Sequence, residues 1–124
     1  MSVKPVLING EWKISSGTHT FHAVNPATKE QLPEEFPVSP WSEIDEAVQS
    51  AAKAAEVVRN WPGSRFADFL RKYADLIEQR ADALVKAAHA ETALPVSPRL
   101  KDGELPRTTG QLRQAADSAD AESW

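Results

Sequence analysis

The sequence predicts an α+β protein, in which an amino-terminal β-hairpin or ribbon is followed by about three α-helices. Two observations predict this class. Turn-forming residues separate short apolar segments in the first part of the chain, and from Ser42 onward apolar residues recur at spacings of three and four. A proline-rich connector lies between the two patterns. With 124 residues, we expect a single domain, with the ribbon and connector over residues 1–41 and the helical part over residues 42–124.

The ribbon is expected from two short strands, Val6–Ile8 and Thr20–Val24. Asn9-Gly10 and Ser15-Ser16-Gly17 supply turn residues between and around these strands. The connector KEQLPEEFPVSPW follows and is rich in proline, which can neither donate to a β-ladder nor continue a helix. We therefore expect an extended connector with an edge strand around Phe36–Val38.

The first helix is expected to begin at Ser42, because SEID places a serine cap three residues ahead of an acid. Its apolar face is narrow and ends where Pro62-Gly63 breaks the helix. A second helix of about six turns is expected after Ser64, with a broader apolar stripe of Phe66, Phe69, Leu70, Tyr73, Ile77, Leu84 and Val85. The part of this stripe from Phe66 to Ile77 should form the core.

A third helix is expected in the segment TTGQLRQAADSADA, after a loop that runs from ETALPVSP to Pro106. Thr108 and Gln111 fit a capping box at its start. Leu112, Ala115, Ala116 and Ala119 are expected on one side of this helix.

The composition excludes several kinds of site. The chain has no cysteine, so it supplies no disulfide, thiolate metal site or cysteine nucleophile. Its net charge of −4 comes from interspersed acidic and basic residues, which argues against a nucleic-acid partner. No apolar run is long enough for a membrane span, and the amino terminus lacks a signal-peptide core. We therefore expect no membrane partner and a cytoplasmic location.

The histidines and glycines do not form a recognisable site either. His19 and His22 are three residues apart in a predicted strand and should point to opposite faces, while His89 has no ligand-type residue four positions away. We interpret all three as surface or packing residues. The five glycines are too widely spaced for a dinucleotide fingerprint or a P-loop. We predict no catalytic, cofactor-binding or metal residue in this chain.

Four segments, taken in order, resemble the amino-terminal region of aldehyde dehydrogenases. They are LINGEW, TFHAVNPATKEQL, an alanine-rich helix ending in NWPG, and RFADFLRKYADLIEQRADALVKAAHAETALP. The similarity spans essentially the whole chain, and RTTGQLR with a nearby SW looks like the 2,5-dioxovalerate (α-ketoglutarate semialdehyde) dehydrogenase branch. The chain departs from the family's glycine at Lys29 and at Ala93.

The resemblance implies an incomplete part of the family's cofactor domain, a single partial domain over residues 1–124. The family's catalytic cysteine, general base and NAD or NADP site would lie beyond these residues, so this chain should bind no cofactor and be inactive alone. Some members hold a structural cation, for which the resemblance offers Ala23, Val24 and Glu91. An ordinary helix-end carboxylate is the alternative interpretation of Glu91.

Two hypotheses about function remain open. The chain is either the amino-terminal fragment of an NAD(P)-dependent aldehyde dehydrogenase or a stand-alone helical protein-interaction module without enzymatic activity. On the fragment hypothesis, Trp124 marks the point at which a longer protein has been cut, and the helices are left with uncovered apolar faces. We expect self-association through them, or binding to the remainder of an aldehyde dehydrogenase.

Overall fold

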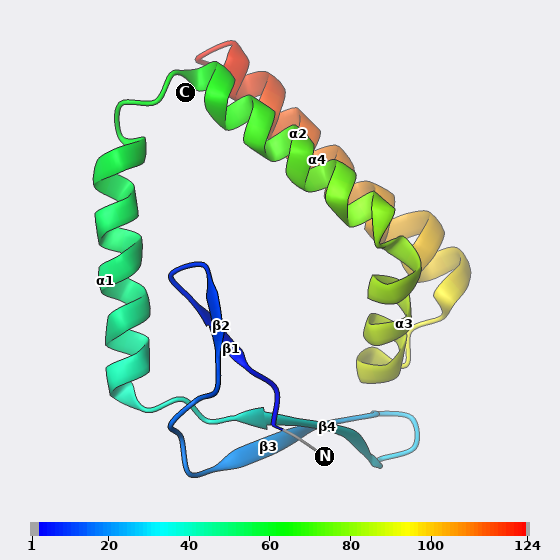
Figure 1. Ribbon diagram of the computed structural model, residues 1–124. Helices are drawn as coiled ribbons and strands as arrows, with labels where there is room; N and C mark the ends of the chain where they lie inside the picture. The colour runs from blue at the N-terminus through cyan, green and yellow to red at the C-terminus, as the bar shows by residue number, and fades with distance from the viewer. Residues whose placement is uncertain (1–2, 124) are drawn as a thin grey trace. The chain divides into compact units, whose positions relative to one another are not determined.

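The computed structural model describes residues 3–123 and divides into two compact units, residues 1–60 and 61–124. The first unit holds the strands and one helix, and the second is helical (Figure 1). The predicted α+β class is confirmed. The described residues form two antiparallel strand pairs and four α-helices, one more helix than predicted. The prediction for Trp124 lies outside the described residues.

The first strand pair is a tight hairpin of β1 (Val6–Ile8) and β2 (Glu11–Lys13). Its two-residue turn has positive φ at both positions, 53° at Asn9 and 79° at Gly10. Asparagine and glycine tolerate this conformation, and the twist of such a turn matches that of the flanking strands. The strand Val6–Ile8 is confirmed, whereas β2 was missed because three residues are too few to show an alternating pattern.

The second strand pair joins β3 (Thr20–Val24) to β4 (Gln31–Pro37). β3 has the predicted bounds, but β4 is longer than the expected strand at Phe36–Val38, and most of the supposed connector is strand. A strand with one partner leaves its other edge free, so its prolines need not donate to a ladder. Phe21 pairs with Phe36 across the two strands, and their rings stack 5.6 Å apart.

α1 (Trp41–Val58) begins one residue before the predicted cap. The expected capping box at Ser42 is wrong, because Pro40 is the N-cap residue and no side chain caps this end. The predicted apolar face is also largely exposed, including Ile44 and Val48.

The expected six-turn helix is two helices, α2 (Gly63–Gln79) and α3 (Ala81–Thr92). Arg80 interrupts them with φ −109° and ψ 15°, outside the helical region. The sequence here has no proline or glycine, and its apolar spacing continues through the break. A periodic pattern therefore could not reveal this bend.

The segment expected to be a loop before Pro106 is also largely helical. η1 (Val96–Glu104) has π-type hydrogen bonds, such as that from the Leu100 amide to the Pro95 carbonyl at 3.1 Å, with a non-helical residue at Ser97. It continues directly into α4 (Leu105–Asp120). Pro106 lies in the first turn of α4, where a missing amide proton costs little. The expected capping box is wrong here too, since the Thr108 hydroxyl donates to the Glu104 carbonyl instead.

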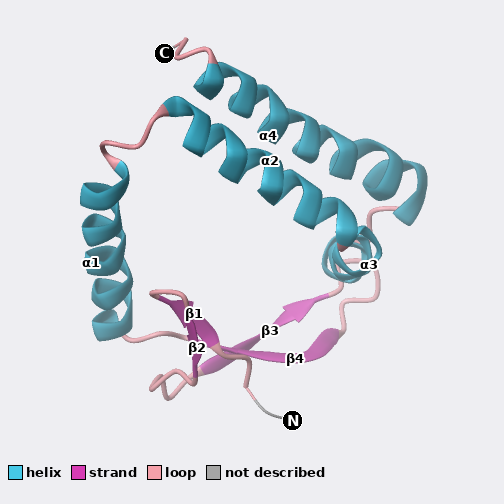
Figure 2. Ribbon diagram, turned by 45° about the horizontal axis from the view of Figure 1, so that its top comes forward, coloured by secondary structure: helices cyan, strands magenta, loops and turns pink. Residues whose placement is uncertain are grey.

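The core of the second unit lies between α2 and α4, which run side by side in Figures 1 and 2. Its buried residues are small, namely Ala67, Ala116 and Ala119, with Phe66 and Leu70 packed against them. The expectation that all of the stripe from Phe66 to Ile77 forms the core is wrong. Small residues allow the two helices to approach closely, so part of the stripe is left outside.

Candidate functional site

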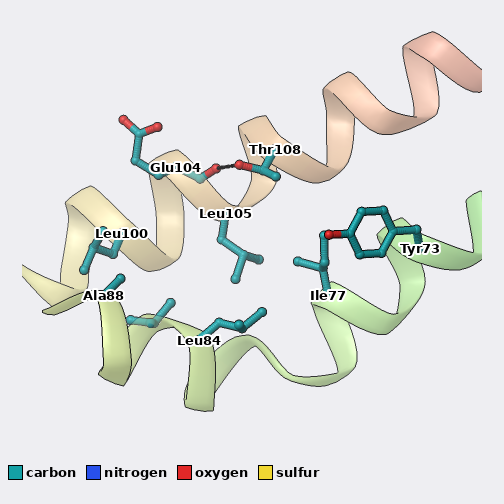
Figure 3. Close-up of a pocket in the computed structure, with 9 residues that line it drawn as sticks. Tyr73, Ile77, Leu84, Ala88, Leu100, Glu104, Leu105 and Thr108 are labelled. Atoms are coloured by element: carbon teal, nitrogen blue, oxygen red, sulfur yellow. Dashed lines mark hydrogen bonds between the residues drawn. The ribbon is translucent and has the colours of Figure 1, made fainter. Parts of the chain in front are cut away.

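The second unit has an apolar pocket of about 280 Å³ beside the end of α2. Residues from α2, α3, η1 and α4 line it: Tyr73, Ile77, Leu84, Val85, Ala88, Leu100, Glu104, Leu105 and Thr108. Figure 3 shows these side chains, with Ile77 and Leu105 facing each other across it. The bend at Arg80 and the turn through η1 bring these four elements together.

Two polar side chains of this pocket, Thr108 and Glu104, already have partners. The Thr108 hydroxyl donates to the Glu104 carbonyl at 2.9 Å, and the Glu104 carboxylate pairs with Arg99 at 2.7 Å. The lining contains no histidine or lysine and no acid other than Glu104. The pocket can therefore receive an apolar group but offers no paired base and nucleophile of the kind that covalent catalysis requires.

An exposed apolar stripe on α2 adjoins the pocket through Tyr73. We call it the α2 stripe and define it as Phe69, Tyr73 and Leu76. Phe69 and Tyr73 are 62% and 50% exposed, and their rings stack 6.2 Å apart. Leu76 lies one turn further along and is 38% exposed. The spacing of four and three residues places all three on one side of the helix.

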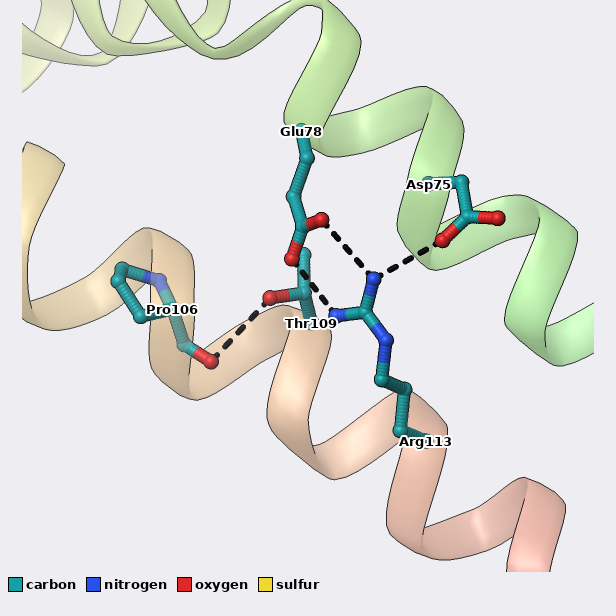
Figure 4. A network of polar contacts seen from close by, with 5 residues as sticks. All are labelled: Asp75, Glu78, Pro106, Thr109 and Arg113. Atoms are coloured by element: carbon teal, nitrogen blue, oxygen red, sulfur yellow. Dashed lines mark hydrogen bonds and ion pairs between the residues drawn. The ribbon is translucent and has the colours of Figure 1, made fainter.

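A network of charged side chains joins α2 to α4 at a different place (Figure 4). Arg113 donates to both oxygens of the Glu78 carboxylate, at 2.6 and 2.9 Å, and to Asp75 at 2.9 Å. The hydrogen bond to Glu78 raises the pKa of Arg113, and Arg113, followed by the Thr109 hydroxyl, lowers the pKa of Glu78. Both shifts favour the charged forms, so we interpret the network as a structural link between the helices.

The carboxylate of Glu43 makes a cluster of polar contacts in the first unit. Glu43 is only 8% exposed. It accepts hydrogen bonds from the Ser16 amide at 2.6 Å, the Ser15 hydroxyl at 2.7 Å and the Ser16 hydroxyl at 3.0 Å. The Ser16 amide, followed by the Ser15 hydroxyl, lowers the pKa of Glu43 to about 2. This contact ties the segment after β2 to the first turn of α1, and the capping interpretation of SEID missed it.

The three histidines make local contacts. His19 lies near the Thr18 hydroxyl, His22 near the Leu32 carbonyl and His89 near the Leu94 carbonyl, with distances of 3.1, 3.0 and 2.7 Å from Nδ1. Within residues 3–123, no three His, Cys, Asp or Glu side chains are arranged to hold a metal ion.

The residues that the resemblance offers for a cation lie in different units. Ala23 and Val24 belong to β3, and Glu91 belongs to α3. Their assignment stays a prediction.

Both departures from the family glycines occur at left-handed backbone positions. Lys29 has φ 62° in the turn between β3 and β4, and Ala93 has φ 57° at the end of α3. Glycine adopts such angles at little cost, whereas other residues are strained there. Glycines at these two positions, which the resemblance implies for the family, would relieve this backbone strain.

Comparison with known proteins tests the predicted family. The sequence model of the aldehyde dehydrogenase family matches residues 12–123. Alpha-ketoglutaric semialdehyde dehydrogenase 2 of Azospirillum brasilense is 35% identical over 114 residues, covering 91% of this chain and 21% of that protein.

Solved structures agree with this match. An aldehyde dehydrogenase of Bartonella henselae superposes with a TM-score of 0.86 at 18% identity, over 96% of this chain and 25% of that one. NADP-dependent glyceraldehyde-3-phosphate dehydrogenase of Bacillus halodurans, solved with NADP, superposes with a TM-score of 0.83 at 28% identity, over 95% and 24%. The chain thus spans about a fifth to a quarter of the length of these relatives. None of the described helices has the length and apolar character needed to cross a bilayer. Since the family model accounts for nearly the whole sequence, this chain belongs to the aldehyde dehydrogenase family.

Proposed function

We propose that this chain supplies the amino-terminal part of an NAD(P)-dependent aldehyde dehydrogenase, which oxidises an aldehyde to a carboxylic acid. The family match over residues 12–123 carries the proposal. A semialdehyde is the first substrate to test, because the Azospirillum relative is an alpha-ketoglutaric semialdehyde dehydrogenase. In this proposal residues 1–124 form a single partial domain of a cytoplasmic enzyme.

We also propose that the chain is catalytically silent by itself. It contains no cysteine to form a covalent adduct with an aldehyde. Its five glycines stand at least seven residues apart, so no glycine-rich loop can cradle the pyrophosphate of a dinucleotide. The residues present therefore do not fit NAD or NADP, and both cofactor and chemistry belong to other parts of the fold.

Two measurements test this proposal. Calorimetric titration of the purified chain with NAD and NADP should show no binding, and semialdehyde oxidation should stay at background. Micromolar cofactor binding would contradict the claim of silence. A chimera, in which residues 1–124 replace the matching segment of the Azospirillum enzyme, should oxidise α-ketoglutaric semialdehyde. A folded but inactive chimera would count against the role in catalysis.

A stand-alone interaction module is the second candidate, and the exposed α2 stripe favours it. An exposed apolar surface of this kind tends to find a partner. We propose either self-association or binding to the remainder of an aldehyde dehydrogenase, with no nucleic acid or membrane involved. Light scattering across micromolar concentrations separates these outcomes, because a module that self-associates would give a mass above that of a monomer.

A further inference from the structure

We propose that the α2 stripe, together with the adjoining pocket, is the surface of the second unit on which the rest of the aldehyde dehydrogenase fold packs. The occupant is the polypeptide that corresponds to the part of the relatives not covered by this chain. This inference rests on the proposed function and adds the location of the contact.

The first argument is the distribution of polar and apolar groups on the second unit. Two arginines of the unit already form ion pairs within it. Arg113 pairs with Glu78 and Asp75, and Arg71 pairs with Asp117 and Asp120. The α2 stripe exposes two aromatic rings and a leucine to solvent. Covering these side chains would remove apolar area from water, whereas covering the charged network would cost its hydration.

The second argument is the size and chemistry of the pocket. At about 280 Å³ it lies just below the range of about 300–1,000 Å³ that is typical of small-molecule sites. Two of its polar side chains are already bonded, Thr108 to the Glu104 carbonyl and the Glu104 carboxylate to Arg99. Tyr73 belongs to both the pocket and the stripe, so a polypeptide lying along α2 could insert one apolar side chain there.

The third argument concerns the identity of the occupant. Nearly all of this chain, 96%, superposes on only 25% of the Bartonella enzyme, with a TM-score of 0.86. The same elements thus occur there within a chain about four times as long. Polypeptide of that fold is therefore the occupant to which we commit, in preference to a second copy of this chain.

The test compares one substitution in two contexts. Phe69→Ser and Leu76→Ser remove apolar groups of the stripe, and Lys72→Ser is the matched control at an exposed position on the same helix. In the isolated chain, Phe69→Ser should unfold close to the denaturant midpoint of Lys72→Ser, because Phe69 is 62% exposed, and Leu76→Ser should unfold at a somewhat lower midpoint, because Leu76 is only 38% exposed. In the chimera with the Azospirillum enzyme, the two stripe variants should lower the thermal midpoint by several degrees, while Lys72→Ser should not.

Other results separate this inference from the proposed function. If the chimera is active but its three variants have the same thermal midpoint, the inference is overturned and the proposed function is left intact. Co-expression of the chain with the remaining part of the Azospirillum enzyme is an independent measurement. Copurification should survive Lys72→Ser and be lost with Phe69→Ser. A dimer of the isolated chain that Phe69→Ser dissociates would assign the stripe to a second copy and overturn the choice of occupant.

Discussion

The close approach of α2 and α4 predicts opposite effects of alanine on stability at two glycines, Gly63 and Gly110. A Cβ atom added at Gly63 would lie 2.1 Å from the carbonyl oxygen of Ala119 and 3.1 Å from its carbonyl carbon. Both atoms belong to backbone, so neither can rotate away. Gly110, also in a helix, has nothing within 4 Å of its added Cβ. An alanine side chain would therefore clash with backbone at Gly63, whereas Gly110 has space for it.

The expected magnitudes follow from these distances. Restoring ordinary contact at Gly63 requires the helix ends to separate by about 1.3 Å. Overpacking of this kind costs about 1–3 kcal/mol. Because Gly63 is the first residue of α2, the helix propensity of alanine, which applies to helix interiors, returns little of this cost. Gly63→Ala should therefore destabilise the chain by about 1–3 kcal/mol, while Gly110→Ala should stabilise it by up to about 1 kcal/mol.

Urea denaturation followed by far-ultraviolet circular dichroism measures both variants against the unmodified chain. The midpoint should fall for Gly63→Ala and rise for Gly110→Ala, with an unchanged slope. If Gly63→Ala is as stable as the unmodified chain or more so, the start of α2 does not pack against the end of α4, and the reasoning fails.

Two further predictions concern backbone strain and pH. Ala93→Gly should stabilise the chain by about 0.5–1 kcal/mol in the same urea assay, because Ala93 has a left-handed backbone conformation. The control Ala87→Gly, inside α3, should destabilise the chain by a similar amount. A loss of stability with Ala93→Gly would show that the backbone at Ala93 is not strained. Because the pKa of Glu43 is lowered from 4.5 to about 2 in the folded chain, its ionised carboxylate stabilises the fold at pH values above 4.5. This contribution should be lost as the pH falls toward about 2. Glu43→Gln should abolish that acid dependence, measured by amide exchange at Ser16, and an unchanged acid profile would show that the contact is absent in solution.

Local chemistry was sufficient to predict several elements from the sequence. Asn9-Gly10 predicted a turn because few residues accept positive φ, and β3 was found with the bounds that the structure shows. The absence of cysteine and of a glycine-rich loop was visible without a structure. The family resemblance also depended only on the order of short motifs, and the match over residues 12–123 confirmed it.

Tertiary structure decided what local patterns leave open. Apolar spacing placed Phe69 and Tyr73 on one face of a helix, but the identity of the buried face depended on α4, which packs against Ala67 because small residues allow a close approach. No local pattern names the partner of the Glu43 carboxylate, because Ser16 lies 27 residues earlier in the chain and only the fold brings the two together. The sequence therefore determined the Asn9-Gly10 turn, the strand β3, the presence of helices after residue 41 and the family, since these depend on residues close in the chain. The core, the ion-pair network and the exposed stripe depend on contacts between residues far apart in the chain, which only the tertiary structure reveals.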